Sequence, residues 1–255
     1  MKQKSITTSK YILESHLLND DLMYYQHHHH YEFPLNESDV FGNYWVLGFA
    51  ELEPGQLYFS DGSRNLELKG AFGILIPPFS IVQWRVRSKK LIWHAFIWKQ
   101  HLFTELPRLN KPVAFSLLKK HWPTSLESLN AVLNCQLSKL DFNENEKINT
   151  SQKIKTLIDE SLGESLSIKQ ISQTLGLSPS VITRSFKKFF GVTPVCYRNK
   201  LRVFESMIHL LFEKEKTNIA QLGFQVGFSD LSRYNKEFKK FILTSPKDFQ
   251  LKKHR

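Results

Sequence analysis

Residues 165–191 have the sequence SLSIKQISQTLGLSPSVITRSFKKFFG, and this stretch decides the fold of the C-terminal part of the chain. Its first apolar residues recur at helical spacing: Ile168, Ile171 and Leu175. Gly176 permits the left-handed turn that ends a helix. Ser178 and Pro179 then favour a new helix, because serine caps a free amide and proline has none to lose. A short helix, a glycine turn and a capped helix predict a helix-turn-helix unit.

The second helix of this unit is predicted over Ser180 to Phe190, with a stop at Gly191. Apolar spacing predicts its buried face: Ile182, Phe186 and Phe189. Its opposite face is polar and basic: Ser180, Thr183, Arg184, Lys187 and Lys188. Such an outer face suits contact with a polyanion.

A second copy of this pattern lies about 51 residues further along the chain. Leu222 corresponds to Ile171 and Gly227 to Gly176, and Ser229 and Asp230 are the expected helix cap. The apolar residues of the following helix are Tyr234, Phe238 and Phe241. Its outer face presents Ser232, Arg233, Asn235, Lys236, Lys239 and Lys240. Because the basic face is repeated, we favour nucleic-acid contact over a merely solvated helix surface.

The two units are joined by a predicted helix over Pro194 to Lys214. Its apolar residues recur at helical spacing: Val195, Leu201, Phe204, Ile208 and Leu211. About 20 residues at roughly 1.5 Å each span about 30 Å, close to the roughly 34 Å of one turn of B-DNA. This length allows two recognition helices to enter successive major grooves on one face of the duplex.

The charge of the chain is distributed unevenly. The net charge is +11, yet residues 1–150 hold 16 Lys and Arg against 15 Asp and Glu, whereas residues 151–255 hold 19 against 9. The C-terminal part therefore attracts a polyanion, either nucleic acid or an anionic membrane. The sequence contains no apolar run of about 18 residues, so it predicts no membrane span. Residues 1–21 lack the pattern of a secretory signal, and the two cysteines cannot form a disulfide framework, so we expect a cytoplasmic protein.

These motifs together resemble the AraC/XylS transcription regulators over about residues 150–250. The matching segments are Leu175–Ser180, Phe186–Lys188, Gly191–Pro194, Arg202, Val226–Asp230, Phe238–Lys240 and Thr244–Phe249. Gly223 and Ser206 stand where the family usually has Ala, and Leu243 stands where it has Gly. Leu231 stands where a polar residue is common.

The resemblance implies a set of DNA contacts. The expected base contacts are Ser180, Thr183, Arg184, Leu231, Ser232, Asn235 and Lys236. The expected phosphate contacts are Lys187, Lys188, Arg233, Lys239 and Lys240. Arg184 is the strongest of these, because Arg reads guanine with two hydrogen bonds that contribute roughly 1–3 kcal/mol of discrimination. Lysine on phosphate raises affinity without reading sequence.

The N-terminal part is predicted to be a β-barrel of the cupin-like, jelly-roll type. Candidate strands are Tyr44–Ala50, Gln56–Ser60, Asn65–Lys69, Phe72–Ile76, Ile81–Val86 and Leu91–Trp98. Asp61 and Gly62 predict a hairpin, and residues 53–55 and 77–78 predict turns. Gly73–Pro78 resembles the glycine-to-proline segment of cupin barrels, which commonly form the effector-sensing domain of this regulator family.

A barrel of this type offers a pocket for a small-molecule effector. We expect the pocket residues to be Tyr44, Trp84, Arg85, Trp93, His94 and Trp98. The tract His27–His30, with Glu32 nearby and His94 on a later strand, raises the alternative of a metal site. A surface or pocket-lining tract is the favoured interpretation, and we expect no metal and no other cofactor.

The whole chain is therefore expected to be an α+β protein of three parts. Residues 1–98 form the sensing barrel, residues 99–150 a helical linker with a leucine stripe, and residues 151–255 the all-α domain with two helix-turn-helix units. The stripe fits either a homodimer contact or packing onto the chain's own barrel. The resemblance implies a transcription activator that binds double-stranded DNA and contacts RNA polymerase. The alternatives are a metal-dependent cupin enzyme with a nucleic-acid tether, and a regulator gated by a protein partner.

Overall fold

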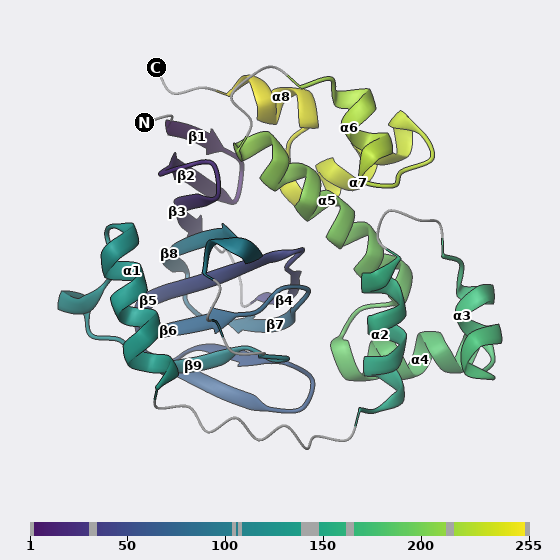
Figure 1. Ribbon diagram of the computed structural model, residues 1–255, viewed down its shortest axis with the longest axis horizontal. Coiled ribbons are helices and arrows are strands. Elements are labelled where there is room, and N and C mark those ends of the chain that lie inside the picture. Colours follow the sequence, from purple (N-terminus) through teal and green to yellow (C-terminus); the bar gives the residue numbers. More distant parts are fainter. Residues whose placement is uncertain are drawn as a thin grey trace.

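The computed structural model describes residues 3–30, 35–103, 106, 109–138, 148–161, 166–212 and 217–252. A β-barrel with one covering helix packs against a helical region, and the long helix α5 (Pro194–Phe212) runs diagonally through that region (Figure 1). Glu32, residues 104–105, 107–108 and 139–147 of the expected linker, and Lys214 lie outside the described residues.

The strands that the structure describes form one antiparallel sheet. They are β1 (Gln3–Thr7), β2 (Tyr11–Leu17), β3 (Leu22–His30), β4 (Leu35–Val40), β5 (Tyr44–Ser60), β6 (Asn65–Ile76), β7 (Ile81–Val86), β8 (Lys90–Lys99) and β9 (Val113–Ser116). Their order is β1-β2-β3-β8-β5-β6-β9, and β7 links β4 to β5. The cupin-like barrel expected from the sequence is thus present, with four strands before Tyr44 that the pattern did not predict.

Strand β5 closes the barrel because it bends and pairs on both sides of the bend. Tyr44–Phe49 pairs with β8, whereas Leu57–Ser60 pairs with β7, and the register with β6 shifts between Leu52 and Leu57. The sequence predicted two strands separated by a turn at residues 53–55. Instead, the Pro-Gly pair sits in a β-bulge, which bends a strand without ending it.

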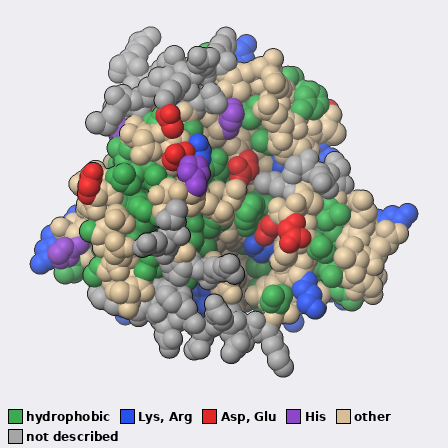
Figure 2. All heavy atoms as spheres, in the orientation of Figure 1, with side chains coloured by type: hydrophobic (Ala, Val, Ile, Leu, Met, Phe, Trp, Pro, Cys, Tyr) green, Lys and Arg blue, Asp and Glu red, His purple; other side chains and the backbone are tan. Residues whose placement is uncertain are grey.

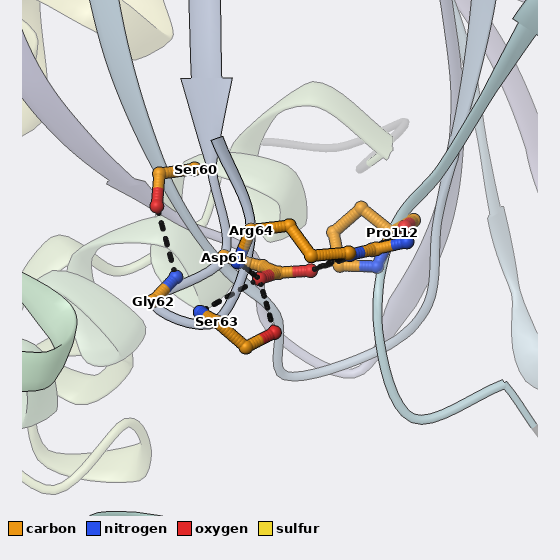
Figure 3. Close-up of polar contacts among 6 residues, drawn as sticks. All are labelled: Ser60, Asp61, Gly62, Ser63, Arg64 and Pro112. Atoms are coloured by element: carbon orange, nitrogen blue, oxygen red, sulfur yellow. Dashed lines mark hydrogen bonds and ion pairs between the residues drawn. The ribbon is translucent and has the colours of Figure 1, made fainter. Parts of the chain in front are cut away.

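The expected hairpin at Asp61 joins β5 to β6, and Asp61 organises its turn (Figure 3). Asp61 Oδ1 accepts hydrogen bonds from the backbone amides of Ser63 and Arg64, at 3.0 and 2.9 Å. The Arg64 guanidinium donates to Asp61 Oδ2 at 2.5 Å and to the carbonyl of Pro112 at 2.7 Å. The tip of the hairpin is therefore a fixed structure, tied to the segment that leads into β9.

Helix α1 (Leu126–Leu137) covers one face of the sheet (Figure 1). Its buried residues Leu129, Val132 and Leu133 pack with Trp45, Leu47, Phe49, Phe96 and Trp98 of the sheet. The leucine stripe is therefore used for packing within the chain, as one of the two interpretations expected. Strand β9 lies in the segment that was expected to be helical. The sequence did not predict this strand, because its four residues, Val-Ala-Phe-Ser, are too few to show a period.

The C-terminal region contains α2 (Thr150–Glu160), α3 (Ile168–Leu175), α4 (Pro179–Phe190), α5, α6 (Ile219–Gln225), α7 (Leu231–Ile242) and α8 (Pro246–Leu251). The sequence predicted the start of α4 correctly: Ser178 caps it, and Pro179 is its first residue. Helix α3 ends at Gly176 in the left-handed conformation, also as predicted. Helix α7 ends at Leu243, whose φ of 63° is strained for a residue with a side chain.

The barrel and the helical region share their hydrophobic cores. One core joins residues of the barrel lumen to Val203, Ile208 and Leu211 of α5, and another joins Val40 and Ile81 of the barrel to α2 and α4. Near the chain ends, Lys252 donates a hydrogen bond to the carbonyl of Thr7 at 2.8 Å, and both ends lie at the same side of the molecule (Figure 1). The barrel therefore contacts both helix-turn-helix units directly.

Candidate nucleic-acid interface and interdomain cavity

Helix α4 presents a polar and basic face to solvent. Buried Ile182, Phe186 and Phe190 anchor its inner face. The outer face exposes Ser180, Arg184, Lys187 and Lys188, with Thr183 half-buried among them. The sequence had assigned Phe189 to the buried face; Phe190 takes that place, because it continues the four-residue spacing of Ile182 and Phe186. All five predicted contact residues of α4 therefore lie on one accessible face.

Helix α7 repeats this arrangement. Asp230 caps it by accepting the amide of Arg233 at 2.7 Å, and Tyr234 and Phe238 are fully buried. The outer face exposes Leu231, Ser232, Arg233, Lys236, Lys239 and Lys240, with Asn235 half-buried. Leu231 keeps 40% of its surface exposed, which is a large apolar exposure for the first turn of a helix. Six of the seven predicted contact residues of α7 are thus exposed and Asn235 is half-buried, and Lys240 also borders the cavity described below.

A buried arginine connects α5 to the turn of the second unit. The Arg202 side chain lies 5.8 Å from the ring centroid of Phe228, and a Cβ on Gly227 would meet its guanidinium at 2.8 Å. Burial, together with the nearby Arg198 and Arg233, lowers the pKa of Arg202 to about 10. Arg202 is therefore a packing element of the turn between α6 and α7, and the absent side chain of Gly227 makes room for it.

The C-terminal end of each of these helices rests on the barrel. Gln83 of β7 donates a hydrogen bond from Nε2 to the carbonyl of Phe189, at 3.1 Å. The hairpin tip drawn in Figure 3 also lies against this end, since a Cβ on Gly62 would come within 2.7 Å of Phe189. At the end of α7, the Tyr11 hydroxyl donates to the carbonyl of Ile242 at 2.5 Å. The barrel thus contacts both α4 and α7.

On the face shown in Figure 2, Lys and Arg side chains lie at the right-hand edge, on the side where Figure 1 places α3 and α4, and also at the left-hand edge and nearer the centre. Hydrophobic side chains occupy much of the centre of this face. Positive charge is therefore spread over several parts of this face.

A cavity of about 330 Å³ lies in the lumen of the barrel, beneath the helical region. Alternate residues of the strands form its wall, among them Tyr25, His27 and His29 of β3, Glu37 and Asp39 of β4, and Trp84 and Trp93 of β7 and β8. Helices α5 and α7 close it with side chains that include Val203, Met207, Leu211, Lys240 and Phe241. The cavity is therefore shared between the barrel and the second helix-turn-helix unit.

Of the six predicted pocket residues, Trp84 and Trp93 border this cavity. Because side chains alternate along β8, Trp93 faces the lumen whereas His94 and Trp98 face the α1 side. His94 lies 2.7 Å from the Tyr24 hydroxyl, and Trp98 is stacked with Trp45. The exposed Arg85 lies over the ring of Tyr58, and Tyr44 packs against Phe204 and Phe212 of α5.

The tract His27–His30 was expected at the surface or in a pocket wall, and His27 and His29 line the cavity, whereas Glu37 and Asp39 were not predicted. The period of two along β4 and β3 was the available signal: Leu35, Glu37 and Asp39 share one face, as do Tyr25, His27 and His29. The His tract obscured it, because four identical residues show no alternation. Within the described ranges no group of three or more His, Cys, Asp or Glu could hold a metal ion, and Glu32 lies outside them.

Burial controls the protonation of the groups around the cavity. Burial and the neighbouring histidines lower the pKa of His29 to about 4, and the pKa of His27 is lowered as well. Burial raises the pKa of Asp39 and of Glu37, and it outweighs the opposing effect of Lys200. The two imidazoles are therefore neutral near neutral pH.

In the described part of the chain no helix is long and apolar enough to cross a membrane.

Comparison with known proteins supports the interpretation of the helical region. Residues 171–252 match the model of a family described as a helix-turn-helix domain. The Msm operon regulatory protein of Streptococcus mutans is 32% identical over 110 residues, which cover 41% of this chain and 39% of that protein. The transcriptional regulatory protein HptR of Staphylococcus aureus is 30% identical over 92 residues, which cover 36% of this chain and 35% of HptR. The chain thus spans less than two-fifths of the length of these relatives.

The complete fold is similar to that of ToxT from Vibrio cholerae. A structure of ToxT at 1.65 Å resolution is 14% identical, covers 92% of this chain and 100% of ToxT, and gives a TM-score of 0.51. A structure of ToxT bound to an unsaturated fatty acid is 11% identical, covers 93% of this chain and 98% of ToxT, and gives a TM-score of 0.52. Residues 171–252 are therefore an AraC-type helix-turn-helix domain, in a chain that combines it with a barrel as ToxT does.

Proposed function

We propose that this chain is a sequence-specific DNA-binding regulator of transcription, with α4 and α7 as its recognition helices. One observation carries the proposal: two capped helices expose polar and basic faces and are joined by the single helix α5. The 19 residues of α5 span about 28 Å at roughly 1.5 Å each, slightly less than one turn of B-DNA. A bipartite site with centres about 10 base pairs apart suits this length.

The roles of individual residues follow from their places on the two faces. Ser180, Thr183 and Arg184 lie in the N-terminal half of α4, where a recognition helix reaches base edges. Leu231, Ser232, Asn235 and Lys236 take the same part in α7, and Leu231 offers its exposed surface to a thymine methyl group. Lys187, Lys188, Arg233, Lys239 and Lys240 supply phosphate contacts.

The cavity supports a small-molecule effector. Its volume of about 330 Å³ lies at the lower end of the usual range for ligand sites, roughly 300–1,000 Å³. Because its wall includes α5 and α7, a bound molecule would contact both the barrel and the second recognition unit. Such a ligand would shift the population between arrangements with different DNA affinity. ToxT, which has this fold, was solved with an unsaturated fatty acid, and this also favours a ligand over a protein partner as the gate.

Further parts of the proposal rest on the family resemblance. We propose a cytoplasmic activator that contacts RNA polymerase and acts as a homodimer. Since the apolar face of α1 packs on its own sheet, a dimer would have to use another surface. The rival, a metal-dependent cupin enzyme with a nucleic-acid tether, requires stoichiometric metal in the purified protein, which elemental analysis would detect.

Selection of genomic DNA fragments by the full-length protein tests the DNA-binding function. Arg184→Ala removes the strongest expected base contact, and Arg87→Ala removes an exposed arginine from the barrel as a matched control. We expect the wild type and Arg87→Ala to enrich the same two-part motif, and Arg184→Ala to lose preference at one part, with a cost of roughly 1–3 kcal/mol there. Binding without any sequence preference in all three proteins would overturn the proposal and favour a nonspecific tether.

A further inference from the structure

Two carboxylates face the cavity without an ion-pair partner. Glu37 and Asp39 are two positions apart on β4, so both side chains point to the lumen face of the strand. Glu37 is exposed at the rim of the cavity, whereas Asp39 is half-buried and accepts a hydrogen bond from Trp84. In the described ranges neither carboxylate takes part in an ion pair. A partly desolvated carboxylate outside any ion pair is stabilised by a nearby positive charge, so this wall of the cavity favours a bound cation.

The lysines that border the cavity leave this requirement unmet. Lys200 donates to the carbonyl of Ser38 at 2.5 Å, and its amine lies 5.1 Å from the ring of Phe241. Lys240 lies 3.9 Å from the carboxylate of Glu237 and over the same ring. Lys10 is exposed. Although Lys200 is near both carboxylates, burial still raises their pKa, which means that the resident positive charge does not compensate for the lost hydration.

The histidines of the lumen add polar surface and no positive charge. Nε2 of His29 lies 2.7 Å from Nδ1 of His27, and burial lowers the pKa of both rings. Nε2 of His27 is buried and has no hydrogen-bond partner in the described structure. A buried polar atom of this kind normally has a hydrogen-bond partner, and a polar group of a ligand would supply one here.

Aromatic rings stand beside the carboxylates. Trp84 is paired with Glu37 across the β4–β7 ladder, and its ring centroid lies 5.4 Å from that of Trp93, with the rings edge to face. Aromatic faces attract ammonium groups, and carboxylates attract them further. The rest of the wall is mostly apolar, with Met207 and Leu211 of α5 opposite the strands.

We infer that the cavity binds a compact organic cation, with its ammonium group toward Glu37 and Asp39 and its apolar body between Trp84, Trp93 and helix α5. This inference rests on the proposed function, since it names the chemical class of the effector in the same cavity. A volume of about 330 Å³ admits a ring with a short alkylamine and excludes a much larger molecule. We expect the site to prefer the cation to an anion of the same shape, because Glu37 and Asp39 stand outside any ion pair, whereas Lys200 and Lys240 have contacts of their own and Lys10 is exposed.

Two probes of matched shape test the inference: phenylbutylamine, a cation, and phenylbutyrate, an anion. Both are titrated into the full-length protein by calorimetry, with intrinsic tryptophan fluorescence, to which Trp84 and Trp93 contribute, as a second readout. We expect the amine to bind at least about tenfold more tightly than the acid. The double variant Glu37→Gln with Asp39→Asn should lose about tenfold in affinity for the amine, and Glu53→Gln, an exposed carboxylate away from the cavity, should change nothing.

The outcomes separate this inference from the proposed function. Tighter binding of phenylbutyrate, or equal binding of both probes, would overturn the cation and leave a cavity that takes another class of ligand. Amine binding that persists in the double variant would also overturn it. If neither probe binds while the protein still selects a two-part DNA motif, the cation fails and the DNA-binding function stands. Circular dichroism of each variant confirms that it is folded.

Discussion

Two glycines that end helices of the first unit have the same backbone conformation and different surroundings. Gly176 and Gly191 both adopt positive φ, of 64° and 75°. A Cβ on Gly176 would meet nothing within 4 Å, whereas on Gly191 it would come within 2.9 Å of Oε1 of Gln83 and 3.1 Å of Oγ of Ser38. A side chain at Gly176 is therefore opposed only by backbone strain, whereas a side chain at Gly191 is also opposed by contact with the barrel.

This difference predicts unequal costs for the same substitution. Gly176→Ala should lower the free energy of unfolding by about 1 kcal/mol, from the left-handed conformation alone. Gly191→Ala should cost more, because the added methyl group also presses on Gln83 and Ser38. Urea denaturation of the two variants measures both costs. Equal costs would mean that the barrel does not hold the end of α4 in solution.

At the scale of elements, we expect the basic outer faces of α4 and α7 to contribute to the salt dependence of DNA affinity, which an ordinary charged surface does not. Lys187→Ala and Lys239→Ala each remove one exposed lysine from a recognition helix. If each neutralises a phosphate, the slope of log affinity against log salt should fall by about 1 in each variant. Lys153→Ala, which removes an exposed lysine from α2, should leave the slope unchanged. A titration of DNA affinity against salt checks this, and unchanged slopes in all three variants would return these lysines to plain solvated surface.

The helical elements could be predicted from the sequence because their signals are local. Ser178 and Pro179 mark the start of α4 and Gly176 marks the end of α3, through capping and backbone conformation, and the structure confirms both boundaries. Phe189 could not be assigned correctly, since the spacings from Phe186 to Phe189 and to Phe190 both suit a helix, and contact with the distant Gly62 is what separates them.

The cavity could be predicted only in part, because strand parity depends on pairing. Trp93 and His94 are neighbours on β8, and only the register with β3 and β5 shows which of them faces the lumen. Strand β4, which supplies Glu37 and Asp39, carries polar residues on both faces, so its period of two does not show in the sequence which face lines the lumen. Their role appears when β4 pairs with β7 and when α5 covers the barrel.

At the scale of the whole molecule, the two recognition helices are connected twice. Helix α5 joins the two units through the chain, and the barrel joins them again through Gln83 at the end of α4 and Tyr11 at the end of α7. The cavity lies between these two contacts, and Tyr11 forms part of its wall. The barrel is therefore placed to influence the separation of the recognition helices.

If the barrel restricts that separation, removing its hydrogen bonds to the helix ends should change which half-site spacings the protein binds. Gln83→Ala combined with Tyr11→Phe removes both side-chain hydrogen bonds to the helix ends and leaves α4 and α7 intact. DNA selected by this double variant should keep the half-site sequences of the wild type and show a broader range of spacings between them, because the recognition faces are unchanged and their relative position is less constrained. Arg85→Ala, an exposed arginine that neighbours Trp84 and lies over Tyr58, is the matched control. A range of spacings as narrow as that of the wild type would mean that α5 alone sets the distance between the recognition helices. Any ligand in the cavity would then have to act through α5 itself.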